Sequence, residues 1–245
     1  IDFEKTIKTS AFSKSDAEFK KRFLNKFIAK GFPSRKFENW KFSDINQIIQ
    51  KNIGELSFYN DYSLSNKIDT SIFIDGLEHN KIVFINGMVE KIDFTFEDKD
   101  KIEINKDSQL IDKLENNNSL IDLNSAFTNK SYKISVKENY SFNKPLIVYH
   151  TSNNKIKSKN INLRLEFELG QNSSLRLIDF FNDPSEKNFI NIFYNFDLKK
   201  DSILKNYKID KTQNNNIRYS FNNINQDENS VSETFILSAG SDFLK

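Results

Sequence analysis

The sequence contains no cysteine, and it has only six glycines, three prolines and one methionine in 245 residues. Without cysteine the chain has no disulfide, no thiol nucleophile and no cysteine ligand for zinc or an iron–sulfur cluster. Long apolar runs are missing too, because the longest, such as residues 145–149, fall far short of the roughly 20 residues that a membrane-spanning helix needs. These absences exclude thiol chemistry and membrane-spanning helices within this stretch of chain.

Basic and acidic side chains almost balance. The 36 Lys and Arg residues stand against 34 Asp and Glu residues, which gives a formal net charge of +2. Proteins that bind nucleic acid or anionic membranes through charge carry a marked basic excess. We therefore expect neither kind of partner.

Phenylalanine and asparagine are abundant. The 24 phenylalanines are spread along the chain and argue against disorder, because disordered chains are poor in aromatic residues. The asparagine clusters at 116–118 and 214–216 are interpreted as turns, where asparagine tolerates a positive φ in place of glycine. The length allows one large domain or two small ones.

The first segment is predicted to be a helix. Ser15 and Glu18 fit a capping box that would start the helix at Ser15. Gly31 supplies a helix stop, and Pro33 prevents continuation. The apolar stripe that follows the predicted cap consists of Phe19, Phe23, Phe27 and Ile28.

Three further elements precede residue 126. A short helix is predicted to start at Ser43, and a buried strand over 81–85 leads into Asn86 and Gly87, a strong hairpin signal. Residues 107–124 again show helical spacing. The side chains expected to point inward from the helix after Ser43 are Ile45, Ile48 and Ile49.

From Tyr132 onward the pattern changes to strands. Residues 163–169 and 217–221 alternate apolar and polar, so each is predicted to bury one face and expose the other to solvent. Successive strands are separated by 13 to 16 residues, and two steps make a unit of about 28 residues. The expected strand starts lie near Tyr132, Pro145, Ile161, Ser174, Phe189, Ser202, Ile217 and Val231.

This period favours a mainly β fold in which a parallel β-helix with two strands per turn follows a small helical or mixed N-terminal region. The connections are slightly longer than the spacing of a sandwich or barrel, and no helices separate the strands. A Greek-key sandwich is the alternative. We predict a boundary between residues 1–125, the helical or mixed region, and residues 126–245, the β-helix.

No catalytic or metal-binding motif is present. His79 and His150 are too far apart for a local metal site, and the interpretation is a polar loop for His79 and a surface strand end for His150. Glu166 and Glu168 share one strand face, a pattern compatible with a glycosidase, but an alternating solvated face explains them equally well. We predict no catalytic residue, no metal ligand and no enzyme activity, and the basic stretches 20–22 and 155–159 are predicted to be solvated.

The segment 31–44 contains the only tryptophan, Trp40. The physical interpretation is a structural corner in which Trp40 and Phe42 pack and Glu38 pairs with Arg35 or Lys41.

The same segment resembles the SufB/SufD family of the SUF iron–sulfur cluster assembly system, and within it the SufD subunits. The resemblance continues through the strand before Asn86 and Gly87, then through residues 123–127 and 145–147. These four ordered matches cover most of 31–169. The residues that match the first motif are Gly31, Pro33, Ser34, Arg35, Lys36, Glu38, Trp40, Lys41 and Phe42.

The resemblance implies a right-handed parallel β-helix after an N-terminal helical region. It implies a non-catalytic cytoplasmic scaffold that pairs with a SufB-like subunit and a SufC-like ATPase, and that forms a homodimer in isolation. Its cofactor would be a transient iron–sulfur cluster in the assembled complex. The family's functional histidine would lie beyond Lys245, since Ile1 and Lys245 suggest an N-terminal fragment. The alternatives are a β-helical polysaccharide lyase or glycoside hydrolase, and a structural or adhesive solenoid.

Overall fold

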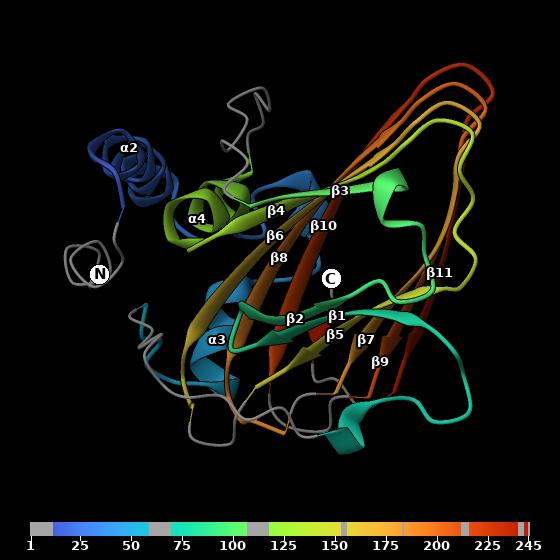
Figure 1. The fold of residues 1–245 in the computed structure, drawn as a ribbon. Coiled ribbons are helices and arrows are strands. Elements are labelled where there is room, and N and C mark those ends of the chain that lie inside the picture. Colours follow the sequence, from blue (N-terminus) through green and yellow to red (C-terminus); the bar gives the residue numbers. More distant parts are fainter. Residues whose placement is uncertain are drawn as a thin grey trace.

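A computed structural model describes residues 12–58, 70–106, 118–152, 156–182, 184–211, 216–239 and 243–244. Most of this chain forms a parallel β-solenoid of about three turns, and a small layer of helices lies against one of its sheets (Figure 1). The mainly β fold class and the helical region before the solenoid are therefore confirmed.

Each turn of the solenoid contributes one strand to each of two sheets. The first sheet has the order β11-β9-β7-β5-β1-β2 and the second the order β12-β10-β8-β6-β4-β3. The strands that form the parallel turns are β4 (Ser131–Val136), β5 (Leu146–Thr151), β6 (Asn160–Leu169), β7 (Ser174–Phe181), β8 (Phe189–Leu198), β9 (Ile203–Asp210), β10 (Ile217–Gln226), β11 (Val231–Ser238) and β12 (Phe243–Leu244).

The register confirms the repeat that the sequence predicts. Asn160 pairs with Phe189, and Phe189 pairs with Ile217, so these turns are 29 and 28 residues long. The first turn is longer, since Ser131 pairs with Arg164. All eight strands begin within one residue of the expected starts.

The beginning of the solenoid is capped by short antiparallel strands. β1 (Asn80–Ile85) pairs in parallel with β5, and it turns back through Asn86 and Gly87 into β2 (Met88–Asp93). Both turn residues have a positive φ, 52° and 83°, as the predicted hairpin requires. β3 (Ile102–Lys106) closes the second sheet antiparallel to β4, after η2 (Thr70–Ile72) and η3 (Lys99–Lys101).

The lumen of the solenoid is packed with the inward side chains of both sheets. Leu165, Phe167 and Leu169 of β6 meet Tyr194 and Phe196 of β8 in this core. The rings of Phe167 and Phe196 stack with centroids 5.4 Å apart. The phenylalanines thus form the core, as the sequence indicates.

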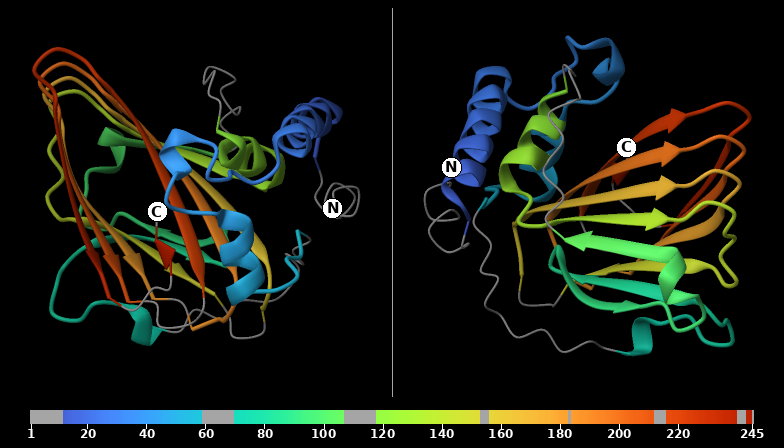
Figure 2. Two further views of the ribbon diagram at one scale, coloured as in Figure 1. Left: turned by 180° about the vertical axis from the view of Figure 1, so that it is seen from behind. Right: turned by 45° about the horizontal axis from the view of Figure 1, so that its top comes forward.

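Three helices cover part of the outer face of the second sheet (Figure 2). They are α2 (Lys14–Lys30), α3 (Ile45–Asn52) and α4 (Ser119–Phe127), with η1 (Glu38–Trp40) between the first two. Phe189, Ile217 and Tyr219 point outward from the sheet into this helical layer. The two parts therefore share a buried apolar cluster.

Helix starts differ from the sequence prediction by one or two residues. Ser13, not Ser15, caps α2 and accepts from the backbone N–H of Asp16. Asp44, not Ser43, caps α3. In both cases a short polar side chain just upstream reaches the free N–H groups of the first turn. Of residues 107–124, the stretch 107–117 lies outside the described residues, and the rest falls in α4.

The prediction of a solvated outer face is wrong for two strands. Arg164 and Glu166 of β6 point outward, yet their side chains are only 3% and 4% exposed. In β10, the alternation predicts Arg218 on the solvated face, but Arg218 points into the lumen and is 4% exposed. Alternation along a strand shows that its side chains lie on two faces, but not whether each face is covered. Here the inner face lines the lumen, and a helical layer covers part of the outer face. The boundary at 125/126 stays a prediction, although β1 to β3 precede it and pair with solenoid strands.

Candidate functional site

A chain of polar and charged side chains runs inside the otherwise apolar lumen. Strand register places these residues inward, since Lys208 pairs with Asp179 and Arg218 pairs with Ile190 of the lumen core. Every one of them is at most 5% exposed. The members are His150 on β5, Asp179 on β7, Tyr194 on β8, Lys208 and Asp210 on β9, and Arg218 on β10.

Asp179 is the centre of this chain. Its Oδ1 lies 2.6 Å from Nε2 of His150 and accepts a hydrogen bond of 2.6 Å from the hydroxyl of Tyr194. The imidazole is held flat between Phe181, with centroids 4.1 Å apart, and Phe84, 5.4 Å away. Ring stacking and one carboxylate therefore fix the orientation of His150.

Lys208 extends the chain toward the last described turn. Its Nζ lies 3.8 Å from Oδ2 of Asp179 and donates to Oγ of Ser220 at 2.8 Å and Oδ1 of Asn222 at 3.0 Å. Ser220 and Asn222 are half-buried residues of β10. The polar chain thus connects the first turn of the solenoid with the last described turn.

A second ion pair lies beside the first. Nη2 of Arg218 is 2.9 Å from Oδ2 of Asp210, and the guanidinium stacks 3.7 Å above the ring of Phe181. Burial lowers the pKa of Arg218, and Asp210 and Asp179 oppose that change. The lumen therefore holds two cations and two carboxylates whose charges offset one another.

Burial governs the acid–base properties of the chain. It lowers the pKa of Lys208 to about 8, although Asp179 opposes the change. Burial alone would raise the pKa of Asp179, but the contacts with His150, Lys208 and Tyr194 hold it below the ordinary value. Burial and the neighbouring Asp179 raise the pKa of Tyr194 well above its usual range.

The imidazole of His150 also borders a small cavity. Its Nδ1 is buried and makes no hydrogen bond within the described chain. The cavity has a volume of about 10 Å³, close to what one water molecule needs, and is lined in part by Gly87, Phe84 and Phe181. His150 is therefore oriented by a carboxylate at one nitrogen and borders a cavity too small for anything larger than a water molecule.

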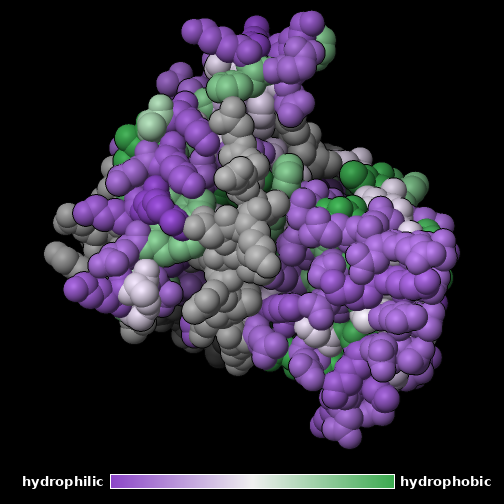
Figure 3. Space-filling view, turned by 90° about the horizontal axis from the view of Figure 1, so that it is seen from above, coloured by the Kyte–Doolittle hydropathy of each residue, from purple (hydrophilic) through white to green (hydrophobic). Residues whose placement is uncertain are grey.

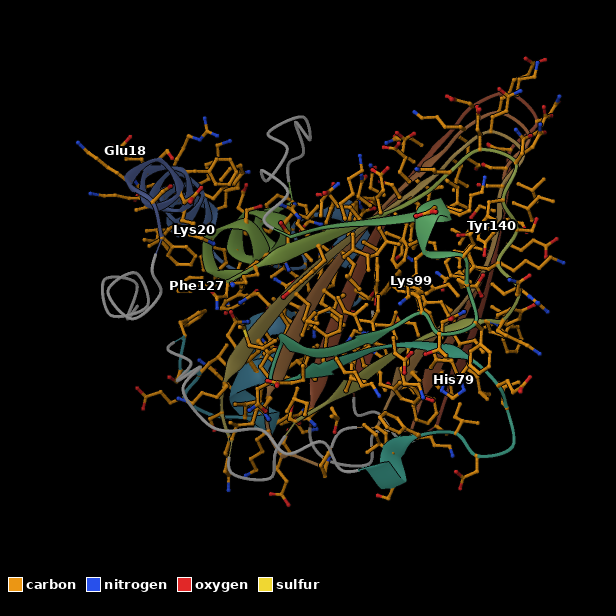
Figure 4. The ribbon with its side chains drawn as sticks, in the orientation of Figure 1. Glu18, Lys20, His79, Lys99, Phe127 and Tyr140 are labelled. Carbon is orange, nitrogen blue, oxygen red and sulfur yellow. The ribbon has the colours of Figure 1, made fainter. Side chains whose placement is uncertain are left out.

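The structure places both histidines in the interior, which corrects the sequence interpretation. His150 is 5% exposed and lies in the lumen rather than on a surface strand end. His79 is not a solvated loop residue, because it too is 5% exposed and bonds to Leu77 O and to the hydroxyl of Tyr149. Figure 4 labels it beside the start of β1. Burial lowers the pKa of His79.

The carboxylate pair is divided between two environments. Glu166 is 4% exposed, and burial raises its pKa despite Arg164 and Lys133. Glu168 remains partly exposed and pairs with Lys133. A polymer substrate would have to reach both carboxylates, and only Glu168 is accessible.

One of the predicted solvated lysines is buried. Lys20 on α2 is 3% exposed and donates to the carbonyl oxygen of Thr128, at the end of α4 (Figure 4). Burial lowers its pKa to about 8, and the charge of Arg164 adds to this effect. Lys21 and Arg22 are exposed, as predicted. In the other basic stretch, Lys155 lies outside the described residues and Lys159 is half-buried.

The corner at 31–44 has only part of its expected packing. Trp40 is buried against Tyr219, with ring centroids 5.7 Å apart. Phe42 is 89% exposed, and Glu38 forms no ion pair with Arg35 or Lys41, so these two expectations are wrong.

The last described turn has a largely uncovered edge. β10 pairs with β12 only through Ile217 and Arg218, and β11 has no partner beyond β9 among the described strands. Phe235, Ile236 and Leu237 of β11 are 52–58% exposed. By contrast, the outer face of the second sheet beyond α4 is largely hydrophilic (Figure 3) and carries ion pairs such as Lys133–Glu168.

Sequence reasoning missed the polar residues of the lumen. The sequence contains a signal for them, because each of these charged residues lies one repeat after a residue whose side chain points into the lumen. Lys208 and Arg218 follow this rule when the repeat of 28 to 29 residues is applied. An alternating pattern alone assigns such residues to solvent.

Comparison with known proteins adds no relative: no family model matches the chain, and no curated protein matches it. No helix in the described part of the chain is long and apolar enough to cross a membrane, and that part contains no cluster of three or more residues suited to hold a metal ion.

Proposed function

We propose that this chain is a SufD-like scaffold subunit of a SUF iron–sulfur cluster assembly complex. Its partners would be a SufB-like subunit and a SufC-like ATPase, and an iron–sulfur cluster would be the cargo of the assembled complex rather than a resident cofactor. The proposal places the chain in the cytoplasm and assigns it no catalytic step. The four ordered motifs and the parallel solenoid support it together.

The parallel solenoid joined to a layer of helices is the observation that carries the proposal, because the resemblance implies this architecture. Each turn stacks its apolar side chains on the next, which gives a rigid body suited to a scaffold. The edge of the first turn is closed by β2, β3 and a bulge between Val83 and Phe84.

The alternative of a β-helical hydrolase receives less support. It needs two carboxylates that face a substrate groove, and Glu166 lies buried beside Arg164. No observation favours an adhesive role.

Co-purification tests the proposal. The full-length protein would be co-expressed with SufB-like and SufC-like subunits, and we expect a complex on size-exclusion chromatography. Absence of any complex with the unchanged protein would contradict the proposal.

A further inference from the structure

The corner at 31–44 is anchored to the rest of the molecule by its apolar residues. Trp40 packs on Tyr219, and Phe32 contacts the rings of Phe27 and Phe189, with centroids 5.1 and 6.0 Å apart. Backbone bonds from Trp40 N to Phe37 O and from Ser43 N to Trp40 O, both 2.8 Å, close the turn. The corner is therefore a fixed platform rather than a loose loop.

Two aromatic and three basic side chains of the corner are exposed. Phe42 is 89% exposed, and Phe37 is 47% exposed. Arg35, Lys36 and Lys41 are exposed and form no ion pair within the described chain, although Nζ of Lys41 lies 5.8 Å from the ring centre of Phe42. We call these five residues the corner patch.

The position of the corner patch leaves it accessible. Figure 2 shows the η1 corner at the outer side of the helical layer, beyond α4 and above α3. No other large apolar residue in the described chain is as exposed as Phe42, since the next, Ile28 and Phe235, are 58% exposed. An aromatic ring that is held out from a fixed turn costs hydrophobic free energy, which contact with a partner would recover.

We propose that the corner patch is a docking site for an acidic peptide segment of another protein, with an aromatic or aliphatic side chain of that segment packed on Phe42. Charge complementarity identifies the occupant, because three cations, Arg35, Lys36 and Lys41, outnumber the two acids of the corner, and one of these acids, Asp44, is engaged as the cap of α3. Such cations steer and orient an acidic partner, while the buried aromatic supplies most of the binding free energy. This inference is independent of the proposed scaffold function.

Other anionic partners fit the patch less well. A polynucleotide is bound through many neutralised phosphates, and three cations on a chain of net charge +2 offer few. Binding at a lipid surface uses an amphipathic helix with a broad apolar face, whereas the corner contains a 3₁₀ turn of three residues. A short peptide matches the size of the patch.

Selection from a displayed library of random 12-residue peptides on the full chain tests the inference. We expect enrichment of peptides that combine Asp or Glu with Phe, Leu or Trp. For an enriched peptide carrying a fluorescent label, Phe42→Ala should raise the Kd about tenfold or more, and Lys36→Glu with Lys41→Glu should do the same and reduce the salt dependence.

Matched variants keep the test independent of folding. Because Phe42 is almost fully exposed, Phe42→Ala should leave the thermal unfolding midpoint unchanged. Leu77→Ala and Lys51→Glu, which change an exposed apolar residue and an exposed cation elsewhere, should leave the Kd unchanged. The inference is overturned if no acidic peptides are enriched, if Phe42→Ala does not alter the Kd, or if anionic vesicles or oligothymidine bind the patch more tightly than the selected peptide.

Discussion

At the scale of single residues, burial decides the properties of the charged side chains. Lys20, Lys208, Asp179 and Arg218 are between 1% and 4% exposed, and each has a hydrogen bond or ion pair inside the protein. A buried charge is tolerated only when such partners offset the loss of hydration. Substitutions at these positions should therefore have large effects, and substitutions at exposed charges small ones.

Asp179→Asn should lower the free energy of unfolding by about 3 kcal/mol or more, because it leaves Lys208 and His150 without their carboxylate in the lumen. Urea denaturation followed by circular dichroism would measure the loss. The control is Asp197→Asn, since Asp197 pairs with Lys199 at the surface and should contribute less than about 1 kcal/mol. Equal effects of the two variants would contradict the assigned role of Asp179.

Lys20 should make the free energy of unfolding depend on pH in the alkaline range. Its pKa is about 8 in the folded protein and 10.5 in the reference state, so between these values the unfolded chain binds more protons and the free energy of unfolding rises with pH. Below about pH 8 Lys20 is charged in the folded protein, and the free-energy cost of burying that charge has its full value. The pKa of Lys208 is also lowered to about 8, so Lys208 adds to the rise in the free energy of unfolding over the same pH range.

Lys20→Met should therefore remove about half of the rise seen by urea denaturation between about pH 7 and about pH 10. The pKa of Tyr194 is raised in the folded protein, so ionisation of this tyrosine in the unfolded chain lowers the free energy of unfolding at higher pH. The measurement is therefore restricted to pH values below that ionisation. Lys21→Met, at the exposed neighbour, should leave the slope unchanged. A wild-type stability that falls with pH in this window would refute the assignment.

At the scale of elements, the spacing between turns depends on a few backbone positions. A residue with a positive φ of 56° to 58° lies between the two strands of each turn, and in three turns it stands two residues before the second strand. These residues are Asn139, Asn172, Asp201 and Asn229. Asparagine and aspartate adopt this left-handed conformation more readily than other non-glycine residues. The abundance of asparagine thus has a structural use. Most of the two asparagine clusters, residues 116–117 and 214–215, lies outside the described residues.

Gly170 is required by close approach of neighbouring turns. A Cβ there would lie 2.6 Å from the backbone N of Glu138 and 2.8 Å from the carbonyl oxygen of Val136. Gly170→Ala should therefore lower the free energy of unfolding by about 1–3 kcal/mol in urea denaturation. Gln171→Ala, at the exposed next residue, should have little effect, and a neutral Gly170→Ala would show that the turns can separate without cost.

At the scale of the whole molecule, helices and solenoid are joined by the apolar cluster that contains Trp40, Phe189, Ile217 and Tyr219. Since this cluster belongs to both parts, neither can lose its packing alone. We expect the fluorescence of Trp40, the only tryptophan, and the circular dichroism of the β-strands to change at the same urea concentration. Two separate transitions would mean that the helical layer unfolds independently.

The sequence by itself determined the repeat and the class of fold. Alternation with a period of two, interrupted every 13 to 16 residues, located all eight strand starts, because the inward apolar residues must recur wherever a new turn stacks on the previous one. It also located the Asn86–Gly87 hairpin and the stop of the first helix at Gly31, which depend on local backbone conformation.

Only the tertiary structure decided which polar residues are buried. His150, Asp179, Lys208 and Arg218 come from four strands. Parallel register aligns Lys208 with Asp179 and His150 with Phe181, and Arg218 faces them across the lumen from the second sheet. Tyr219 is buried because a helical layer distant in sequence covers its face. A period of two gives the face of a strand but not what lies against that face. Contacts between residues far apart in the chain set that environment, and with it the charges that the protein buries.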